Sequence, residues 1–579
     1  MPFGGREREL QALDGWLSDS AAPPYLLIAA PAGRGKSALL VQWLRRLGAN
    51  PNVNVAFVPI SIRFRTNRDD AVFAILAARL AKLNNRELPR AFGLSPEEWR
   101  GVVSGYLADA DPQRKPVVLV IDSLDEAADW QPGPDLFPLQ PPTGLRVVVS
   151  ARLLAGHADA GAWLARLGWT RPGLARTLEL PPLDEAGIIE LLRGAHLLGP
   201  EPVEQDSPEL VSQLHRLTQG DPLLLSLYIK HLSKPQSGAP PLYKQNLPAL
   251  APGLQGYMAL WWDEQRQLWG EKAGRREPAV TSFLNLLAGA LGPLERDDLS
   301  ALDPALDTWS LEDVLPSVQR IVLGDGVRQG FAYAHPRLGA FMFDRLSPTE
   351  KQKLDQRFLQ WGADVLASLQ KDGAASKPAP AYLSQQYSTH LLRAKKHDDL
   401  FALVGTRAWF HAQEAADPSL STFFNDVNRA WMAAETANTA SVKDGHRLGE
   451  LHQEVRCALA AASIRGQSLN YPASVLVALA KTGSWTREQA LQAARRNPDP
   501  AARAQALSSL AVLLPSELEQ TAALREALRS VRELRNTSAY PELRTALEDL
   551  AHRLKTLPLL DEALYRFYIR VSWRYRGRR

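Results

Sequence analysis

Residues 30–37 read A-P-A-G-R-G-K-S and follow a short apolar stretch, Tyr25 to Ile28. Residues 117–126 read V-V-L-V-I-D-S-L-D-E, an apolar run that ends in acidic side chains. The first stretch predicts a glycine-rich turn between a strand and a helix, and the second predicts a buried strand with Asp122 at its end. The carboxyl ends of parallel strands meet at one edge of a sheet, so we expect the two stretches to lie together there.

Strand and helix patterns alternate around these two stretches. Apolar residues recur at helical spacing in 6–17, 39–47 and 71–83. Strand-like runs occupy 25–29, 53–62, 117–121 and 145–150. Strands separated by helices predict an α/β domain with a doubly wound parallel sheet.

The glycine-rich turn resembles the P-loop of proteins that bind nucleoside triphosphates, G-x-x-x-x-G-K-[ST], with Ala30 in place of the first glycine. The resemblance implies that backbone N–H groups converge on the phosphates of ATP or ADP and that Lys36 neutralises the β- and γ-phosphates. It also implies that Ser37 and Asp122 hold Mg²⁺. The turn residues expected to contact the nucleotide are Gly33, Arg34, Gly35, Lys36, Ser37 and Ala38. An ordinary β-turn-α junction is the alternative interpretation.

Composition limits the other possibilities. A length of 579 residues predicts roughly three to four domains. The single cysteine, Cys457, excludes an intrachain disulfide framework and a cysteine-based metal site, which fits a reducing cytoplasm. The first ten residues are charged where a signal peptide would be apolar, and we expect no membrane span. With 67 basic and 63 acidic side chains and a net charge of +4, the balance does not argue for nucleic acid.

Five motifs in one order resemble the STAND ATPases, particularly their NACHT-like members. The segment D-S-L-D-E at 122–126 follows the apolar run 117–121. It resembles their pattern of a hydrophobic run followed by D-[GAS]-h-D-E. V-V-V-S-A-R at 147–152 resembles their sensor-1 strand, and T-Q-G-D-P-L-L-L at 218–225 resembles the G-x-P motif of their helical lid. F-A-Y-A-H-P-R-L-G-A-F at 331–341 resembles the histidine segment of their winged helix. G-G-R-E-R-E-L at 4–10 resembles the entry to their first helix.

This resemblance implies catalytic roles for three residues. Asp125 or Glu126 would orient or deprotonate the attacking water, and Arg152 would sense the charge of the γ-phosphate. The alternative for the acidic pair is a cap on a helix that begins at Ala127, because acidic groups favour a helix N-terminus. The alternative for Arg152 is an ordinary surface arginine.

The same resemblance implies further contacts with the nucleotide. Gly5 and Arg6 would lie against the adenine, and Gly220 and Pro222 would lie near the base and ribose. His335 would contact the β-phosphate of ADP. A histidine before a proline is also a common start of a helix, so a structural role for His335 is the alternative.

The rest of the chain is predicted to be mainly helical. We expect a four-helix lid, and then a winged helix in which F-L-N-L-L-A-G-A-L-G-P-L, from Phe283, forms one helix and V-L-G-D-G-V begins a hairpin. Repeated helical patterns from 488, with an offset of about 36 to 40 residues, predict an α-solenoid, with a plain helical bundle as the alternative. The predicted domains are 1–178 (P-loop NTPase), 179–250 (lid), 251–348 (winged helix), 349–485 (helical) and 486–579 (solenoid-like repeats with a basic tail).

The predicted function is a signalling switch that binds and hydrolyses ATP, by resemblance to the STAND class. ADP would hold the chain closed, and a protein or other ligand on the C-terminal helices would open it for self-association. Such proteins often carry an effector at the N-terminus, and the alternatives here are an effector on a separate protein, a scaffold role for this chain, or a shortened paralogue. The arginine-rich and aromatic segment 566–579 leaves nucleic-acid binding open. The alternatives are a transcription regulator and an AAA+ DNA-associated ATPase that uses its winged helix.

Overall fold

The computed structural model describes residues 3–533 except 49, 51, 65, 84–95, 109–114, 128–129, 135, 139, 155–158, 199–206, 234–243, 372–377, 417–419, 444–448, 468–470, 498–499 and 516. The described residues form two compact units that divide between Trp361 and Gly362. Among these residues, no helix combines the length and the apolar character that crossing a membrane requires.

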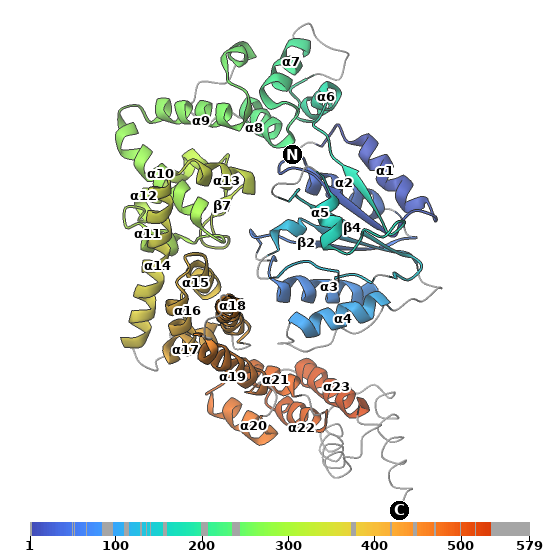
Figure 1. Cartoon of the computed structure of the whole chain (residues 1–579), viewed down its shortest axis with the longest axis vertical. Helices are drawn as coiled ribbons and strands as arrows, with labels where there is room; N and C mark the ends of the chain where they lie inside the picture. The colour runs from blue at the N-terminus through green and yellow to red at the C-terminus, as the bar shows by residue number, and fades with distance from the viewer. Residues whose placement is uncertain are drawn as a thin grey trace, which may run out of the picture. The chain divides into compact units, whose positions relative to one another are not determined.

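The first unit begins with the predicted α/β domain (Figure 1). Its five strands are all parallel and lie in the order β2 (Asn54–Pro59), β3 (Val117–Asp122), β4 (Leu145–Ala151), β1 (Tyr25–Ala29) and β5 (Ala175–Glu179). Helices flank the sheet: α1 (Glu7–Ser18), α2 (Lys36–Gly48), α3 (Asp69–Leu83), α4 (Pro96–Ala108) and α5 (Gly161–Arg166). The prediction of a parallel α/β sheet is confirmed.

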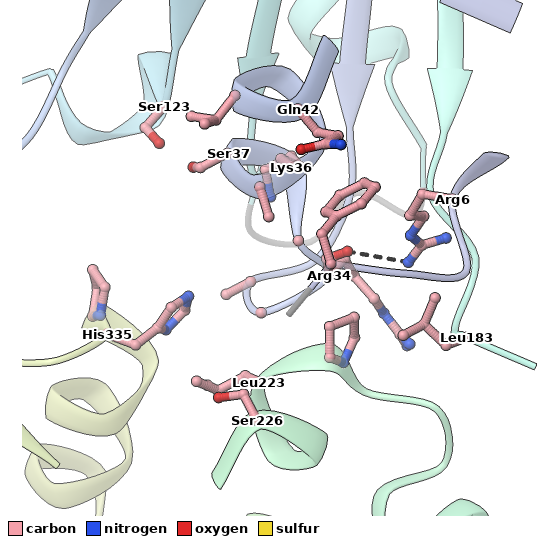
Figure 2. Close-up of a pocket in the computed structure, with 18 of the residues that line it drawn as sticks. Arg6, Arg34, Lys36, Ser37, Gln42, Ser123, Leu183, Leu223, Ser226 and His335 are labelled. Atoms are coloured by element: carbon pink, nitrogen blue, oxygen red, sulfur yellow. Dashed lines mark hydrogen bonds between the residues drawn. The ribbon is translucent and has the colours of Figure 1, made fainter. Parts of the chain in front are cut away.

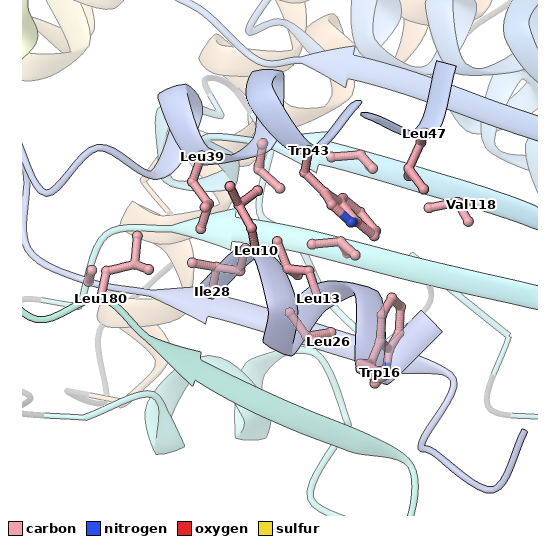
Figure 3. Packing of buried hydrophobic residues seen from close by; sticks show 14 residues of the cluster. Leu10, Leu13, Trp16, Leu26, Ile28, Leu39, Trp43, Leu47, Val118 and Leu180 are labelled. Carbon is pink, nitrogen blue, oxygen red and sulfur yellow. The ribbon is translucent and has the colours of Figure 1, made fainter. Parts of the chain in front are cut away.

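Alternation along the strands explains why α1 and α2 pack on one face of the sheet. Leu26 and Ile28 of β1 and Val148 of β4 point to the same face, because side chains alternate along a strand. They form one buried cluster with apolar side chains of α1 and α2, including Leu13 and Trp43 (Figure 3). This packing fixes α2 against β1 and therefore fixes the turn between them.

A helical segment follows β5. It contains α6 (Glu185–Gly194), α7 (Ser207–Thr218), α8 (Pro222–Ser233) and the 3-10 helix η2 (Lys244–Ala249). The predicted four-helix lid is therefore formed, in the described residues, by three α-helices and a 3-10 helix. The α6 helix begins at a cap in which Asp184 accepts the N–H of Gly187 at 2.9 Å.

The next segment contains the predicted hairpin. Its elements are α9 (Gly253–Trp269), η3 (Gly270–Lys272), α10 (Ala273–Gly289), α11 (Arg296–Leu302), α12 (Thr308–Val318), β6 (Val322–Leu323), β7 (Ala332–Tyr333), α13 (Pro336–Asp344) and α14 (Pro348–Lys371). Strands β6 and β7 pair antiparallel.

The helix predicted from Phe283 through A-L-G-P-L is wrong at its end. The α10 helix begins earlier, at Ala273, and stops at Gly289, after which Ala290 is extended. Pro293 has no N–H to donate and disfavours helical dihedrals in the residue before it, so the helix cannot continue to Leu294. Leu294 instead forms a β-bridge with Phe331, beside the hairpin.

The second unit is helical. Its helices are α15 (Ala381–Arg393), α16 (His397–Val404), α17 (Arg407–Ala416), α18 (Ser421–Lys443), α19 (Leu451–Gln467), α20 (Ala473–Thr482), α21 (Arg487–Arg496), α22 (Pro500–Ala511) and α23 (Glu517–Glu533). The repeat positions Ala490, Leu507 and Ala527 are buried in one apolar cluster. The later repeat positions and the basic tail 566–579 lie outside the described residues.

Candidate functional site

The glycine-rich turn has the backbone that its glycines permit. Gly33 and Gly35 have φ of 88° and 87°, a region that side-chain-bearing residues rarely adopt. Ala30 donates its N–H to Ala151 O at 3.3 Å and so extends the pairing of β1 with β4. Extended backbone is open to any residue, which explains why alanine replaces glycine at the first position of the motif.

Lys36 opens α2 and points back over the turn. Its Nζ donates to Ala30 O at 2.8 Å and to Pro31 O at 3.2 Å, and the residue is 8% exposed. Burial lowers the pKa of Lys36 to about 8, an effect that the nearby Asp125 opposes. The ammonium is therefore still mostly charged at pH 7. Its hydrogen-bond partners in the part of the chain that the structure describes are carbonyl oxygens, which a phosphate can replace.

Ser37 and Asp122 meet at the carboxyl edge of the sheet, as predicted. Burial raises the pKa of Asp122, and hydrogen bonds from the hydroxyls of Ser150 and Ser37 oppose that rise. Ser150 belongs to β4, which lies between β1 and β3 in the sheet. One hydroxyl and one carboxylate suit Mg²⁺, which binds few protein groups and completes its shell with water and phosphate oxygens. Within the described ranges, no group of three or more His, Cys, Asp or Glu could hold a metal by itself.

The acidic pair lies on a short turn after β3. Residues Leu124–Glu126 form a 3-10 helix, and Ser123 before it has a left-handed φ of 62°. Ala127 has a non-helical ψ of 129°, so a helix that starts at Ala127 itself, the alternative considered from the sequence, is not formed. Burial raises the pKa of Glu126, opposed by the N–H of Ile62 and by Arg152. A carboxylate with a raised pKa is suited to accept a proton.

Arg152 is tied to this acidic pair. Its backbone N–H donates to Asp125 Oδ1 at 2.8 Å and its Nε lies 2.9 Å from Asp125 Oδ2. Its Nη2 lies 3.3 Å from Glu126 Oε1. Asp125 thus holds the arginine with both oxygens, whereas Glu126 holds it with only one.

The segment 4–10 and the lid helices pack against the glycine-rich turn. Arg6 is 4% exposed and donates to Arg34 O at 3.1 Å and to Pro181 O at 2.8 Å. Gly5 donates its N–H to Glu190 of α6 at 2.6 Å. Pro222, the first residue of α8, lies 3.8 Å from the position that a Cβ on Gly35 would take. The lid therefore packs directly on the turn.

His335 caps α13, which is the alternative considered from the sequence. Its Nδ1 accepts the N–H of Arg337 at 3.1 Å. Burial lowers the pKa of His335 to about 4, and the positive charges of Arg152 and Arg337 add to this shift. The ring is therefore neutral at pH 7. Because Nδ1 is an acceptor, Nε2 carries the proton and is a hydrogen-bond donor.

Many of these residues line one pocket of about 450 Å³, whereas Gly5 and Asp122 are not among its lining residues. Figure 2 shows Lys36 and Ser37 on α2, Leu223 and Ser226 on α8, and His335 on α13 around it. The pocket is also lined by Arg6, Arg34, Ala38, Gln42, Asp125, Glu126, Arg152, Leu183 and Pro222. Its size is within the range for small-molecule sites, and it combines apolar walls with a few charged groups.

The sequence interpretation missed three residues of this region. Ser150 was read only as part of a strand, although its hydroxyl donates to Asp122. Asp221 and Arg337 form an ion pair beside the turn. Asp221 lies in the motif T-Q-G-D-P, and Arg337 lies in the motif H-P-R. Asp221 precedes a helix that begins with a proline, which is a typical position for an N-cap residue. No sequence signal indicates that the two residues pair.

Comparisons with known proteins support the class of the first domain. Residues 2–149 match the model of the AAA ATPase domain family. No curated protein matches the chain. Similar solved structures include a STAND protein with a tetratricopeptide repeat sensor from Pyrococcus horikoshii, at 14% identity and TM-score 0.40 over 100% of this chain and 78% of that one. Another is Cdc6p from Pyrobaculum aerophilum, at 14% identity and TM-score 0.28 over 60% of this chain and 93% of that one.

The parallel sheet, the glycine-rich turn, the carboxylate after β3 and the family match together define an AAA-type P-loop ATPase domain, followed by a largely helical C-terminal region. The predicted P-loop resemblance is confirmed. The role of each site residue stays a prediction.

Proposed function

We propose that this chain is a nucleotide-dependent switch of the STAND type, in which bound ADP holds the α/β domain, the lid and the winged helix together. The observation that carries the proposal is that one pocket is lined by residues from all three parts, including Lys36, Leu223 and His335. A ligand that bridges three parts stabilises the arrangement in which they meet, by as much as it prefers that arrangement over others.

The proposed chemistry is slow hydrolysis of ATP. Lys36 binds the phosphates, and Ser37 and Asp122 hold Mg²⁺. Glu126, whose pKa is raised by burial, accepts a proton from the attacking water. Asp125 holds Arg152 in place with two contacts, and Arg152 faces the terminal phosphate. Hydrolysis returns the chain to the ADP-bound, closed form.

The proposed switch responds to a ligand and acts on an effector. A ligand on the C-terminal helices opens the chain in the cytoplasm, which allows exchange of ADP for ATP and self-association. An effector on a separate protein then responds.

The alternative function, binding of DNA by the winged helix, is less favoured because α12 (T-W-S-L-E-D-V-L-P-S-V), directly before the hairpin, has two acidic and no basic residues. Stimulation of ATP hydrolysis by duplex DNA would support this alternative.

The proposal is tested at His335. If Nε2–H donates to the β-phosphate of ADP, His335→Ala loses one contact to a charged group, worth about 1.5 to 3 kcal/mol. That loss corresponds to a roughly 10- to 150-fold change in the closed-to-open ratio. We expect faster release of ADP in stopped-flow measurements, more protease cleavage in 234–253, and assembly without a trigger on a sizing column.

His335→Asn is the matched variant, because asparagine keeps the cap on α13 but is too short to reach far into the pocket. The switch predicts that His335→Asn releases ADP as fast as His335→Ala. If His335→Asn keeps the parental rate while His335→Ala does not, the histidine is a helix cap. Parental ADP release and an unchanged sizing profile in both variants would contradict the proposed closing mechanism.

A further inference from the structure

Arg337, the second residue of α13, reaches from the winged helix to both the lid and the P-loop. Its Nη1 pairs with Asp221 Oδ2. The same atom lies 3.5 Å from Ala32 O and 3.0 Å from the position that a Cβ on Gly33 would take. Ala32 and Gly33 line the pocket, and they form the middle of the glycine-rich turn. The guanidinium therefore lies over the part of the turn that cradles β- and γ-phosphates in P-loop proteins.

Asp221 can release Arg337 without losing all of its hydrogen bonds. Its other oxygen, Oδ1, accepts the N–H of Leu223 at 3.0 Å and of Leu224 at 3.2 Å, in the first turn of α8. A helix N-terminus also favours a negative charge. The side chain of Arg337 is 33% exposed, so it has room to turn. The ion pair can thus be exchanged for another acceptor at modest cost.

Other positively charged side chains lie near Arg337 and favour the binding of an anion there. The positive charges of Arg152, Arg337 and Lys36 all act on the pKa of His335, which places three cations near one ring. Arg152 is held by the acidic pair, and Lys36 donates to two carbonyl oxygens and forms no ion pair with a described residue. A terminal phosphate offers two oxygens that a guanidinium binds in parallel, a stronger interaction than one contact with a carboxylate.

We propose that Arg337 distinguishes ATP from ADP by leaving Asp221 for the γ-phosphate. With ADP, Arg337 stays on Asp221 and links α13 to α8. With ATP, the link is broken because Arg337 has a better acceptor, and the winged helix is held to the lid less tightly. This inference rests on the proposed function in one respect, which is that the pocket binds both nucleotides.

The test compares affinities for ADP and for a nonhydrolysable ATP analogue by titration calorimetry of the full chain with Mg²⁺. Arg337→Ala should weaken the analogue about 10- to 100-fold and ADP less than about 3-fold, because only the analogue has the lost partner. Asp221→Asn keeps the cap on α8 but removes the competing charge, so it should bind the analogue at least as tightly as the parent. Arg345→Ala, at the exposed end of the same helix, is the matched control and should change neither affinity.

The two nucleotides and the two variants separate the possible failures. If Arg337→Ala and Asp221→Asn weaken ADP and the analogue equally, the pair is only a strap between domains, and the inference is wrong. If Arg337→Ala leaves both affinities at the parental value, the pair is an ordinary ion pair, and the inference is again wrong. Failure of the parent chain to bind either nucleotide would instead overturn the proposed function itself.

Discussion

Lys36→Ala is expected to abolish tight binding of both ATP and ADP while the chain remains folded. The ammonium of Lys36 lies over the turn, and the hydrogen-bond partners that it has among the described residues are the carbonyl oxygens of Ala30 and Pro31. Loss of charge-assisted contacts with two phosphates should weaken both nucleotides by at least about 100-fold. Titration calorimetry with each nucleotide measures this loss.

Two variants control for effects on folding. Lys36→Met keeps most of the length of the buried side chain but removes its charge, so it should lose binding as Lys36→Ala does. Lys230→Ala, an exposed position on α8, should bind as the parent does. Equal ADP affinity in the parent and in both Lys36 variants would refute the P-loop assignment. Thermal unfolding of each variant shows whether the fold is kept.

The same lysine gives the binding a pH dependence. Burial lowers the pKa of Lys36 to about 8 in the free chain, and bound phosphate raises it again, because an opposite charge favours the protonated form. The complex therefore binds more protons than the free chain above pH 7. Affinity of the parent chain for ADP should therefore fall as the pH rises through about 8, and titration calorimetry across this pH range measures the fall. An ADP affinity that stays constant across this range would contradict the prediction.

Glu126→Gln is expected to keep ATP binding and to lower turnover by about 100-fold or more, the usual scale for loss of a general base. The amide keeps the shape of the side chain and can still accept the N–H of Ile62. It cannot take a proton from water. Steady-state phosphate release measures turnover, and calorimetry with the nonhydrolysable analogue checks that binding is intact.

The neighbour of Glu126 provides the comparison. Asp125 holds Arg152 through both oxygens, so Asp125→Asn should act through the position of that arginine. Glu185→Gln, at an exposed position of α6, should leave turnover at the parental value. Unchanged turnover in both Glu126→Gln and Asp125→Asn would mean that the acidic pair is structural and that the base lies elsewhere.

Local signals in the sequence predict the turn and four of the five strands, but not β5 (Ala175–Glu179), whose residues A-R-T-L-E form no apolar run. The apolar runs of β1 and β3 and the glycines at 33 and 35 each depend on residues adjacent in the chain, and each was predicted where the structure has it. The prediction was wrong at the end of α10, because it did not treat the glycine and proline after this helix as a stop signal. The α10 helix ends at Gly289, shortly before the glycine and proline in A-L-G-P-L, and Leu294 after them forms a β-bridge with Phe331 beside the hairpin.

The sequence by itself determined that the chain contains a P-loop domain with a parallel sheet, because a strand, a turn and a helix form from neighbouring residues. Only the tertiary structure decided which of these side chains have partners. Ser150 lies beside Asp122 because β4 pairs with β3, and Arg337 meets Asp221 and Ala32 although 116 and 305 positions separate them. Spacing along a chain carries no information about such contacts, since the packing of α13 and α8 on the turn creates them.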